Sequence, residues 1–157
     1  MTQSTIVSGS NQAFGSQRKI RAAFDKCDDN FTELYADLVL SVNVPAHASK
    51  TVYNLLNAVR AYTVTSIRYT PDVAQGSALT ACVVKATGTA TPATGTTPMQ
   101  SSTTGINLNG TAHTVQTIAL TATTADLSVA SGERIALVLS GALSTGSGCL
   151  TIRMTRS

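Results

Sequence analysis

The sequence is poor in charged residues. Asp, Glu, Lys and Arg make up 12% of the 157 residues, against about 25% in a typical globular protein. The surface must therefore be covered largely by Thr, Ser, Asn, Gln and small apolar side chains. Because a surface with so few charges is weakly protected against association, this composition favours a protein that packs against copies of itself or against a partner.

Basic clusters and aromatic residues are scarce as well. The net charge is +3, and the seven cations of residues 41–157 are scattered along the chain. Aromatic residues make up 4% of the sequence and Trp is absent. Since nucleic-acid-binding proteins carry a basic stripe or patch, we expect no nucleic-acid partner.

Long apolar runs are also missing. No window approaches the ~20 apolar residues that a membrane-spanning helix needs. The opening stretch, MTQSTIVSGSNQAF, has neither the basic start nor the apolar run of a signal peptide. We therefore expect no membrane partner and folding in a cytoplasm.

Cysteine and catalytic motifs are sparse too. Cys27, Cys82 and Cys149 are an odd number at wide spacing, which fits neither a disulfide framework nor a zinc site. Each lies in an apolar pattern, so we expect small, buried, reduced side chains. There is no P-loop, GxGxxG, HExxH or GxSxG motif. The sequence predicts no metal and no other cofactor.

The titratable residues of the β-region are isolated from one another in sequence. His47 and His113 have no nearby carboxylate, so we expect surface histidines rather than catalytic ones. Asp72, Asp126 and Glu133 stand singly in turns or loops, where turn chemistry explains them. We therefore expect a protein that is not an enzyme.

What the sequence does contain is one dense charged segment, QRKIRAAFDKCDDNFTELYADL, at residues 17–38. It holds five of the eight acidic and four of the eleven basic residues, and a polar arm precedes it. Its apolar residues recur at intervals of four and three, which is a helical heptad pattern. This anchor seam consists of Ile20, Phe24, Cys27, Phe31, Leu34 and Leu38. The seam fits either self-association or docking on the chain's own domain, and its strict period favours self-association.

The same predicted helix carries an acidic ridge. Its four members, spaced by four residues, are Asp25, Asp29, Glu33 and Asp37. Like charges at this spacing cost roughly 0.2–0.5 kcal/mol per pair in an isolated helix. Basic residues in the first turn and acidic residues near the end also oppose the helix dipole. We interpret the ridge as facing a partner that stabilises the helix, with a plain solvated face as the alternative.

After Leu38 the pattern changes from helical to alternating, which is typical of strands. Strands are predicted within residues 38–44, 61–70, 77–87, 111–123, 135–139 and 145–157, with another short strand near 126–129. Residues 46–59 fit a helix or a strand, and the Gly/Pro/Ser/Thr-rich residues 88–105 read as a long loop or two short edge strands. Pro71-Asp72 is expected to end its strand.

About seven to nine short strands without intervening helices predict a mainly β protein. The expected architecture is an N-terminal extended arm and amphipathic helix (1–38), followed by an antiparallel β-sandwich (39–157). A jelly roll is the usual way to close that many strands in one domain.

Residues 19–36, KIRAAFDKCDDNFTELYA, resemble a segment common near the start of tailed-bacteriophage virion proteins, of the form K-I-R/N-x-A-F-x-K-x-N-x-N-F-T-E-L-Y. The matching positions are Ile20, Phe24, Asn30, Phe31, Thr32, Glu33, Leu34 and Tyr35. Cys27-Asp28 depart from the usual Ile-Asn. The match is specific for phage structural proteins but not for one part of the virion.

The alternating Thr/Val strands, with ASGERIAL (130–137) and GSGCLTIRM (146–154), are similar to the jelly-roll domains of phage head decoration (cement) proteins and head fibres. The resemblance implies a trimeric module on the capsid exterior that binds the major capsid protein through its N-terminal anchor. The alternative is a short tail-fibre or tail-adaptor component whose loop 88–105 binds a host glycan. Tyr53, Tyr62 and Tyr69 are then the candidate stacking platforms.

Overall fold

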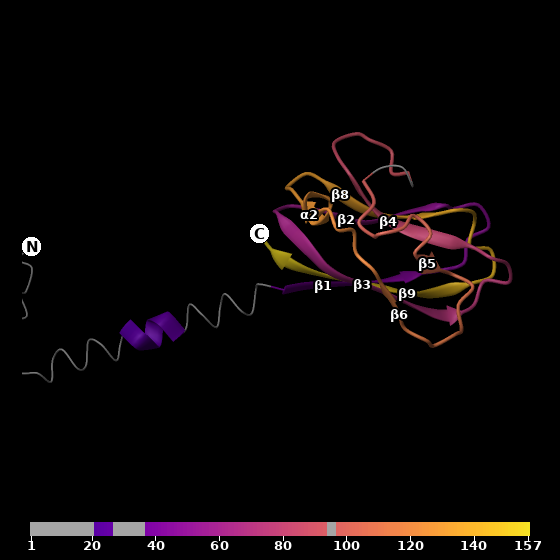
Figure 1. Cartoon of the computed structure of the whole chain (residues 1–157), viewed down its shortest axis with the longest axis horizontal. Coiled ribbons are helices and arrows are strands. Elements are labelled where there is room, and N and C mark those ends of the chain that lie inside the picture. Colours follow the sequence, from indigo (N-terminus) through magenta and orange to yellow (C-terminus); the bar gives the residue numbers. More distant parts are fainter. Residues whose placement is uncertain (1–20, 27–36, 94–96) are drawn as a thin grey trace, which may run out of the picture. The chain divides into compact units, whose positions relative to one another are not determined.

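Apolar and polar residues alternate along Asp37–Val44 and Ser147–Arg156, and their burial follows the alternation. The structure is a computed structural model, and it describes residues 21–26, 37–93 and 97–157. The chain divides into two units, Met1–Ala36 and Asp37–Ser157. In the first unit, residues 21–26 form a helix with exposed side chains. The second unit is an antiparallel β-sandwich (Figure 1), as the sequence predicted.

Two sheets form the layers of the sandwich. The first sheet has the order β1-β9-β3-β6, with β7 pairing to one end of β3. Its bounds are β1 (Asp37–Val44), β9 (Ser147–Arg156), β3 (Tyr62–Val73), β6 (Gln116–Ile118) and β7 (Ser128–Val129). The second sheet has the order β2-β8-β4-β5, with β2 (Val52–Asn57), β8 (Arg134–Leu139), β4 (Thr80–Ala86) and β5 (Ile106–Asn107). A short helix, α2 (Thr124–Leu127), precedes β7.

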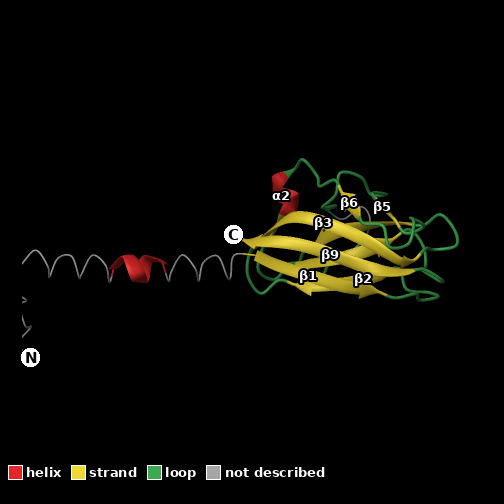
Figure 2. Ribbon diagram, turned by 90° about the horizontal axis from the view of Figure 1, so that it is seen from below, coloured by secondary structure: helices red, strands yellow, loops and turns green. Residues whose placement is uncertain are grey.

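The order of the strands is that of a jelly roll. The chain crosses between the sheets from β1 to β2, from β2 to β3 and from β3 to β4. It stays in the second sheet from β4 to β5 and then returns to the first at β6. The last long strands, β8 and β9, insert into the centres of the two sheets, so that β1, β9 and β3 lie side by side (Figure 2). The jelly-roll prediction is confirmed.

The core lies between the sheets. On β9, Leu150, Ile152 and Met154 are fully buried, and the alternating residues face outward, as the sequence predicted. The core-facing residues Ala81 and Val83 of β4, with Leu79 just before it, join the same cluster. The opposite faces of β4 and β8 are buried as well, in a small cluster of Cys82, Val84, Ala136 and Val138.

The second half of loop 88–105 closes one side of the sandwich. The backbone N–H of Met99 donates to Val83 O on β4 (2.9 Å), and the N–H of Ser101 donates to Ala119 O beyond β6 (2.9 Å). The buried side chain of Gln100 completes the link: its Oε1 accepts from Val83 N (3.1 Å) and its Nε2 donates to Ala81 O (3.1 Å). Gln100 therefore substitutes for a strand along the edge of β4.

Three predictions of local structure need correction, and one helix was not predicted. The helix expected to reach residue 38 does not, because Asp37 and Leu38 begin β1, where they pair with Thr155 and Met154. Pro71 does not end its strand: β3 continues to Val73, with an irregularity in its register after Pro71.

The strand predicted within residues 111–123 is reduced to Gln116–Ile118, since the chain on either side forms turns and loop bonds. Helix α2 was not predicted at all. Residues 46–59, which were open between helix and strand, form β2, whose pairing with β8 shifts register between Asn54 and Leu56.

Candidate functional site

The anchor seam and the acidic ridge fall mostly on residues that the structure does not describe. Ile20, Cys27, Phe31 and Leu34 of the seam, and Asp29 and Glu33 of the ridge, lie outside the described residues. Phe24 and Asp25 lie in the helix at residues 21–26, where Phe24 is 68% exposed.

The remaining members of both sets are placed in the sandwich instead of on a helix. Leu38 lies on β1, partly buried against the core. Asp37 points out from the same strand, with its Oδ2 4.0 Å from Arg153 Nε. Backbone pairing with β9 decides their conformation, so Asp37 and Leu38 do not continue the helical spacing.

Both histidines lie at the surface and serve loop structure. His47 Nδ1 accepts hydrogen bonds from the backbone N–H groups of Ser49 (3.3 Å) and Lys50 (3.1 Å). His113 has a positive φ of 60° and donates its backbone N–H to Pro71 O at 2.7 Å. Within the part of the chain that the structure describes, no group of three or more His, Cys, Asp or Glu side chains is arranged to hold a metal ion.

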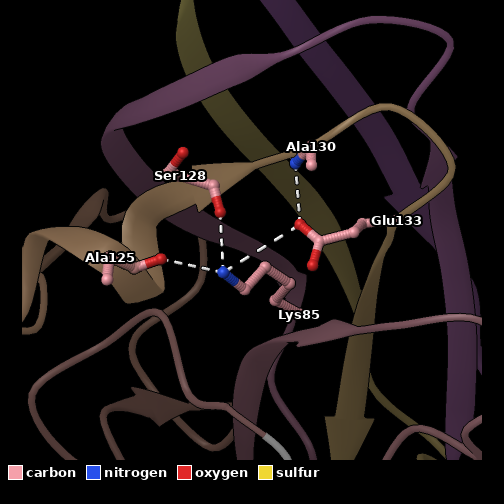
Figure 3. Close-up of polar contacts among 5 residues, drawn as sticks. All are labelled: Lys85, Ala125, Ser128, Ala130 and Glu133. Carbon is pink, nitrogen blue, oxygen red and sulfur yellow. Dashed lines mark hydrogen bonds and ion pairs between the residues drawn. The ribbon is translucent and has the colours of Figure 1, made fainter.

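A polar cluster around Lys85 is the most enclosed charged site of the domain (Figure 3). Lys85 Nζ donates to the backbone oxygens of Ala125 (2.8 Å) and Ser128 (2.7 Å) and lies 4.0 Å from Glu133 Oε2. That same Oε2 accepts the backbone N–H of Ala130 at 2.7 Å. The side chains of Lys85 and Glu133 are 12% and 17% exposed, so Glu133 bonds within its own turn and also lies beside Lys85.

This cluster holds structure together rather than presenting a reactive group. The ammonium of Lys85 donates to two carbonyl oxygens and lies 4.0 Å from a carboxylate, and as an ammonium it has donors but no lone pair. It ties β4 to the segment of α2 and β7. Arg134, the first residue of β8, makes a similar link by donating to Gly88 O (3.1 Å) and Ala90 O (2.6 Å). Sequence spacing offered no signal for either link, because the partners are far apart along the chain.

The tyrosines proposed as stacking platforms are largely internal. Tyr69 is fully buried and Tyr53 is 6% exposed, so neither presents a ring face to a ligand; Tyr62 is partly buried. Burial, with smaller contributions from Asp72 and Cys149, raises the pKa of Tyr69 to about 12. Burial also raises the pKa of the Cys82 thiol to about 11, so Cys82 is a protonated core residue, as expected.

A groove lies between the outer face of the second sheet and loop 88–105. Its volume is about 550 Å³. Hydroxyl groups around it come from Thr51, Thr80, Thr103, Thr104 and Ser140. Val52, Val138 and Pro92 supply apolar surface. The groove is lined without charged side chains among the described residues, so its chemistry suits an uncharged, hydroxyl-bearing ligand.

Helices of the described residues are all too short or too polar to cross a membrane.

Comparison with known proteins finds likeness in structure alone. No protein family model matches the chain, and no curated protein matches it. One solved structure with a similar chain is the acid-stable capsid structure of Helicobacter pylori bacteriophage KHP30, with 14% identity and a TM-score of 0.47, covering 76% of this chain and 87% of that one. The structure of infectious bursal disease virus Gx strain has a chain with 12% identity and a TM-score of 0.38, covering 76% of this chain and 32% of that one. At such low sequence identities and TM-scores, neither likeness says what this chain binds.

Proposed function

We propose that this chain is a non-enzymatic structural protein of a tailed-phage virion, and that it is a capsid decoration (cement) protein. It binds the major capsid protein at the capsid exterior as a homo-oligomer, with a trimer as the expected form. The single observation that supports this function is the junction at Asp37. There, the segment 19–36, which resembles phage virion proteins, leads directly into the first strand of a jelly roll.

The proposed mechanism divides the work between the two units. Residues 1–36 anchor the protein through the members of the seam and the ridge that precede Asp37, and the jelly roll lies outside. An oligomer that binds several capsid subunits at once dissociates only when all contacts break together, so its avidity exceeds the affinity of one contact. The sparse charge of the whole sequence favours such a protein, since few charges must be desolvated on docking.

Co-sedimentation with purified phage heads tests the anchoring role. A variant that lacks residues 1–36 keeps β1 intact, because β1 begins at Asp37, and circular dichroism of the variant checks that the sandwich remains folded. We expect this variant to lose binding to heads. Folded protein that still sediments with heads as the full chain does would contradict the anchoring role.

Point variants refine this test within the full chain. Phe24→Ala removes an exposed apolar side chain of the helix at residues 21–26, and we expect weaker head binding. Val115→Ala is the matched control, since Val115 is also exposed, at 57%, but lies in the jelly roll. Sedimentation equilibrium measures the oligomer, and a monomer at all concentrations would contradict the homo-oligomer.

The alternative function is a tail-fibre or tail-adaptor component, and the hydroxyl-lined groove beside loop 88–105 favours it. The test is a glycan array with the native chain and with Thr104→Arg, which fills the groove. Binding of a glycan by the native chain that the variant loses supports this role. The burial of Tyr53 and Tyr69 argues against it, because sugar sites commonly stack on exposed aromatic rings.

A further inference from the structure

Several cations of the sandwich are already engaged within the fold. Lys85 and Arg134 donate to backbone carbonyl oxygens, and Lys50 Nζ lies 4.4 Å from the centre of the Tyr53 ring. Arg68 and Arg153 are less engaged: among the described residues, Arg153 has one ion pair, with Asp37, and Arg68 has none. Both are exposed, and they share the outer face of the first sheet.

Strand register brings these two arginines together. Arg153 on β9 pairs with Ser66 on β3, and Arg68 on β3 pairs with Thr151 on β9. The two arginines are therefore diagonal neighbours on adjacent strands, with Cα atoms about 7–8 Å apart by standard sheet geometry. All four side chains point to the same face, since residues two apart on a strand face the same way.

A shallow depression of about 180 Å³ lies at this point of the face. It is lined by Arg68, Arg153, Ser66, Thr151 and Val39. Two guanidinium groups and two hydroxyl groups thus surround one small hollow, and all four can donate hydrogen bonds. Val39, which is 51% exposed, adds an apolar wall from β1.

The nearby acid compensates this charge only in part. Asp37 Oδ2 lies 4.0 Å from Arg153 Nε, and the two side chains are 50% and 60% exposed, so solvent screens the pair. Among the described residues, no ion pair of 4.0 Å or less involves Arg68. The two like charges on one face repel each other, and an oxyanion between them would offset that repulsion.

We propose that the depression between Arg68 and Arg153 is a docking site for carboxylate side chains of an acidic partner protein. Charge complementarity selects a carboxylate, which accepts hydrogen bonds from a guanidinium in a bidentate arrangement. The surroundings select a protein, because an array of short polar side chains continues the face beyond the hollow. This array comprises Ser41, Asn43, Thr63, Thr70 and Thr155. The site stands on this face alone and does not depend on the virion role.

Nuclear magnetic resonance of the arginine Nε–Hε groups tests the site in the full chain. Hexaglutamate peptide, hexaglutamine peptide and sodium sulfate are the probes, titrated at constant ionic strength. We expect saturable shifts of Arg68 and Arg153 with hexaglutamate and none with hexaglutamine, while Arg60 and Arg156 stay nearly unchanged. Equal shifts at all four arginines would mean general charge screening and would overturn the proposal.

Paired variants separate the site from net charge. R68Q/R153Q and R60Q/R156Q remove the same charge, and all four side chains are exposed. We expect the first pair to weaken hexaglutamate binding by about tenfold or more, and the second pair to weaken it less than about twofold. Equal weakening by both pairs refutes the site. Saturable binding of sulfate without binding of hexaglutamate would show a small-anion site and would also refute a protein carboxylate as its occupant.

Discussion

Lys85 Nζ lies 4.0 Å from Glu133 Oε2 and donates hydrogen bonds to two backbone oxygens, those of Ala125 and Ser128. One side chain on β4 therefore fixes the segment that contains α2 and β7 and also contacts the turn before β8. In that turn, Gly132 has a φ of +88°, a conformation that glycine adopts without strain. Glu133 in the turn and Lys85 on β4 therefore link this turn to the second sheet.

We predict that Lys85→Met lowers the free energy of unfolding by about 2 kcal/mol, because charge-assisted hydrogen bonds are lost and Glu133 remains partly buried without its cation. Urea denaturation followed by circular dichroism measures the change. Lys50→Met is the control, since Lys50 contributes one exposed contact with the Tyr53 ring, which is expected to cost under about 1 kcal/mol. Equal losses of unfolding free energy in the two variants would show that the enclosed position of Lys85 does not increase its contribution to stability.

Gln100 and Gln116 offer a matched pair of variants. Each side chain accepts from one backbone N–H, that of Val83 for Gln100 and that of Asn107 for Gln116, both at 3.1 Å. Gln100 Nε2 donates to Ala81 O (3.1 Å) and Ser102 O (2.6 Å), and Gln116 Nε2 donates to Asn107 O (2.6 Å). Gln100 is 2% exposed, so Gln100→Met leaves buried β4 groups unpaired and should cost about 3 kcal/mol. Gln116→Met should cost about 1 kcal/mol or less, because water reaches that site. Similar unfolding free energies for both variants would contradict the strand-like role of Gln100.

We expect Tyr69→Phe to preserve or raise stability at neutral pH, by up to about 1 kcal/mol. The Tyr69 hydroxyl is buried without a hydrogen-bond partner among the described residues, and an unpaired buried polar group is costly. Tyr53→Phe is the counterpart, because its hydroxyl donates to Pro45 O at 3.0 Å; that variant should lose about 1 kcal/mol. Thermal melts compare the stability of the two variants. A Tyr69→Phe protein that is less stable than the Tyr53→Phe protein would refute the prediction.

The raised pKa of Tyr69 predicts a loss of stability in alkali. The phenol ionises near pH 10 in the unfolded chain but near a pKa of about 12 in the fold, chiefly because it is buried. As the pH rises between these values, the unfolded chain releases a proton that the folded chain retains, so the equilibrium shifts toward unfolding. The urea midpoint of the native chain should therefore fall faster with pH in this range than that of Tyr69→Phe. If the urea midpoints of the two proteins fall equally with pH, Tyr69 is not the source of the loss of stability in alkali.

The sequence by itself determined the local structure of the longest strands. Apolar residues at every second position of β9 require a strand with one buried face, since side chains alternate across a pleated sheet. The many short strands without helices between them indicated an antiparallel sandwich, and a jelly roll is the usual way to close that many strands in one domain. The resemblance of residues 19–36 to phage virion proteins is also a property of the sequence, and it implies the function that we propose.

Tertiary structure alone decided which distant residues meet. The helical spacing of apolar residues extended the predicted helix to Leu38. In the structure, Asp37 and Leu38 instead pair with β9, which satisfies their backbone groups in a sheet. Tertiary strand pairing overrides the helical periodicity of the local sequence. The neighbours Arg68 and Arg153, the link from Gln100 to β4 and the pair of Lys85 and Glu133 all depend on strand register. Register and crossover order are set by the packing of the whole sandwich, so no local pattern in the sequence encodes them.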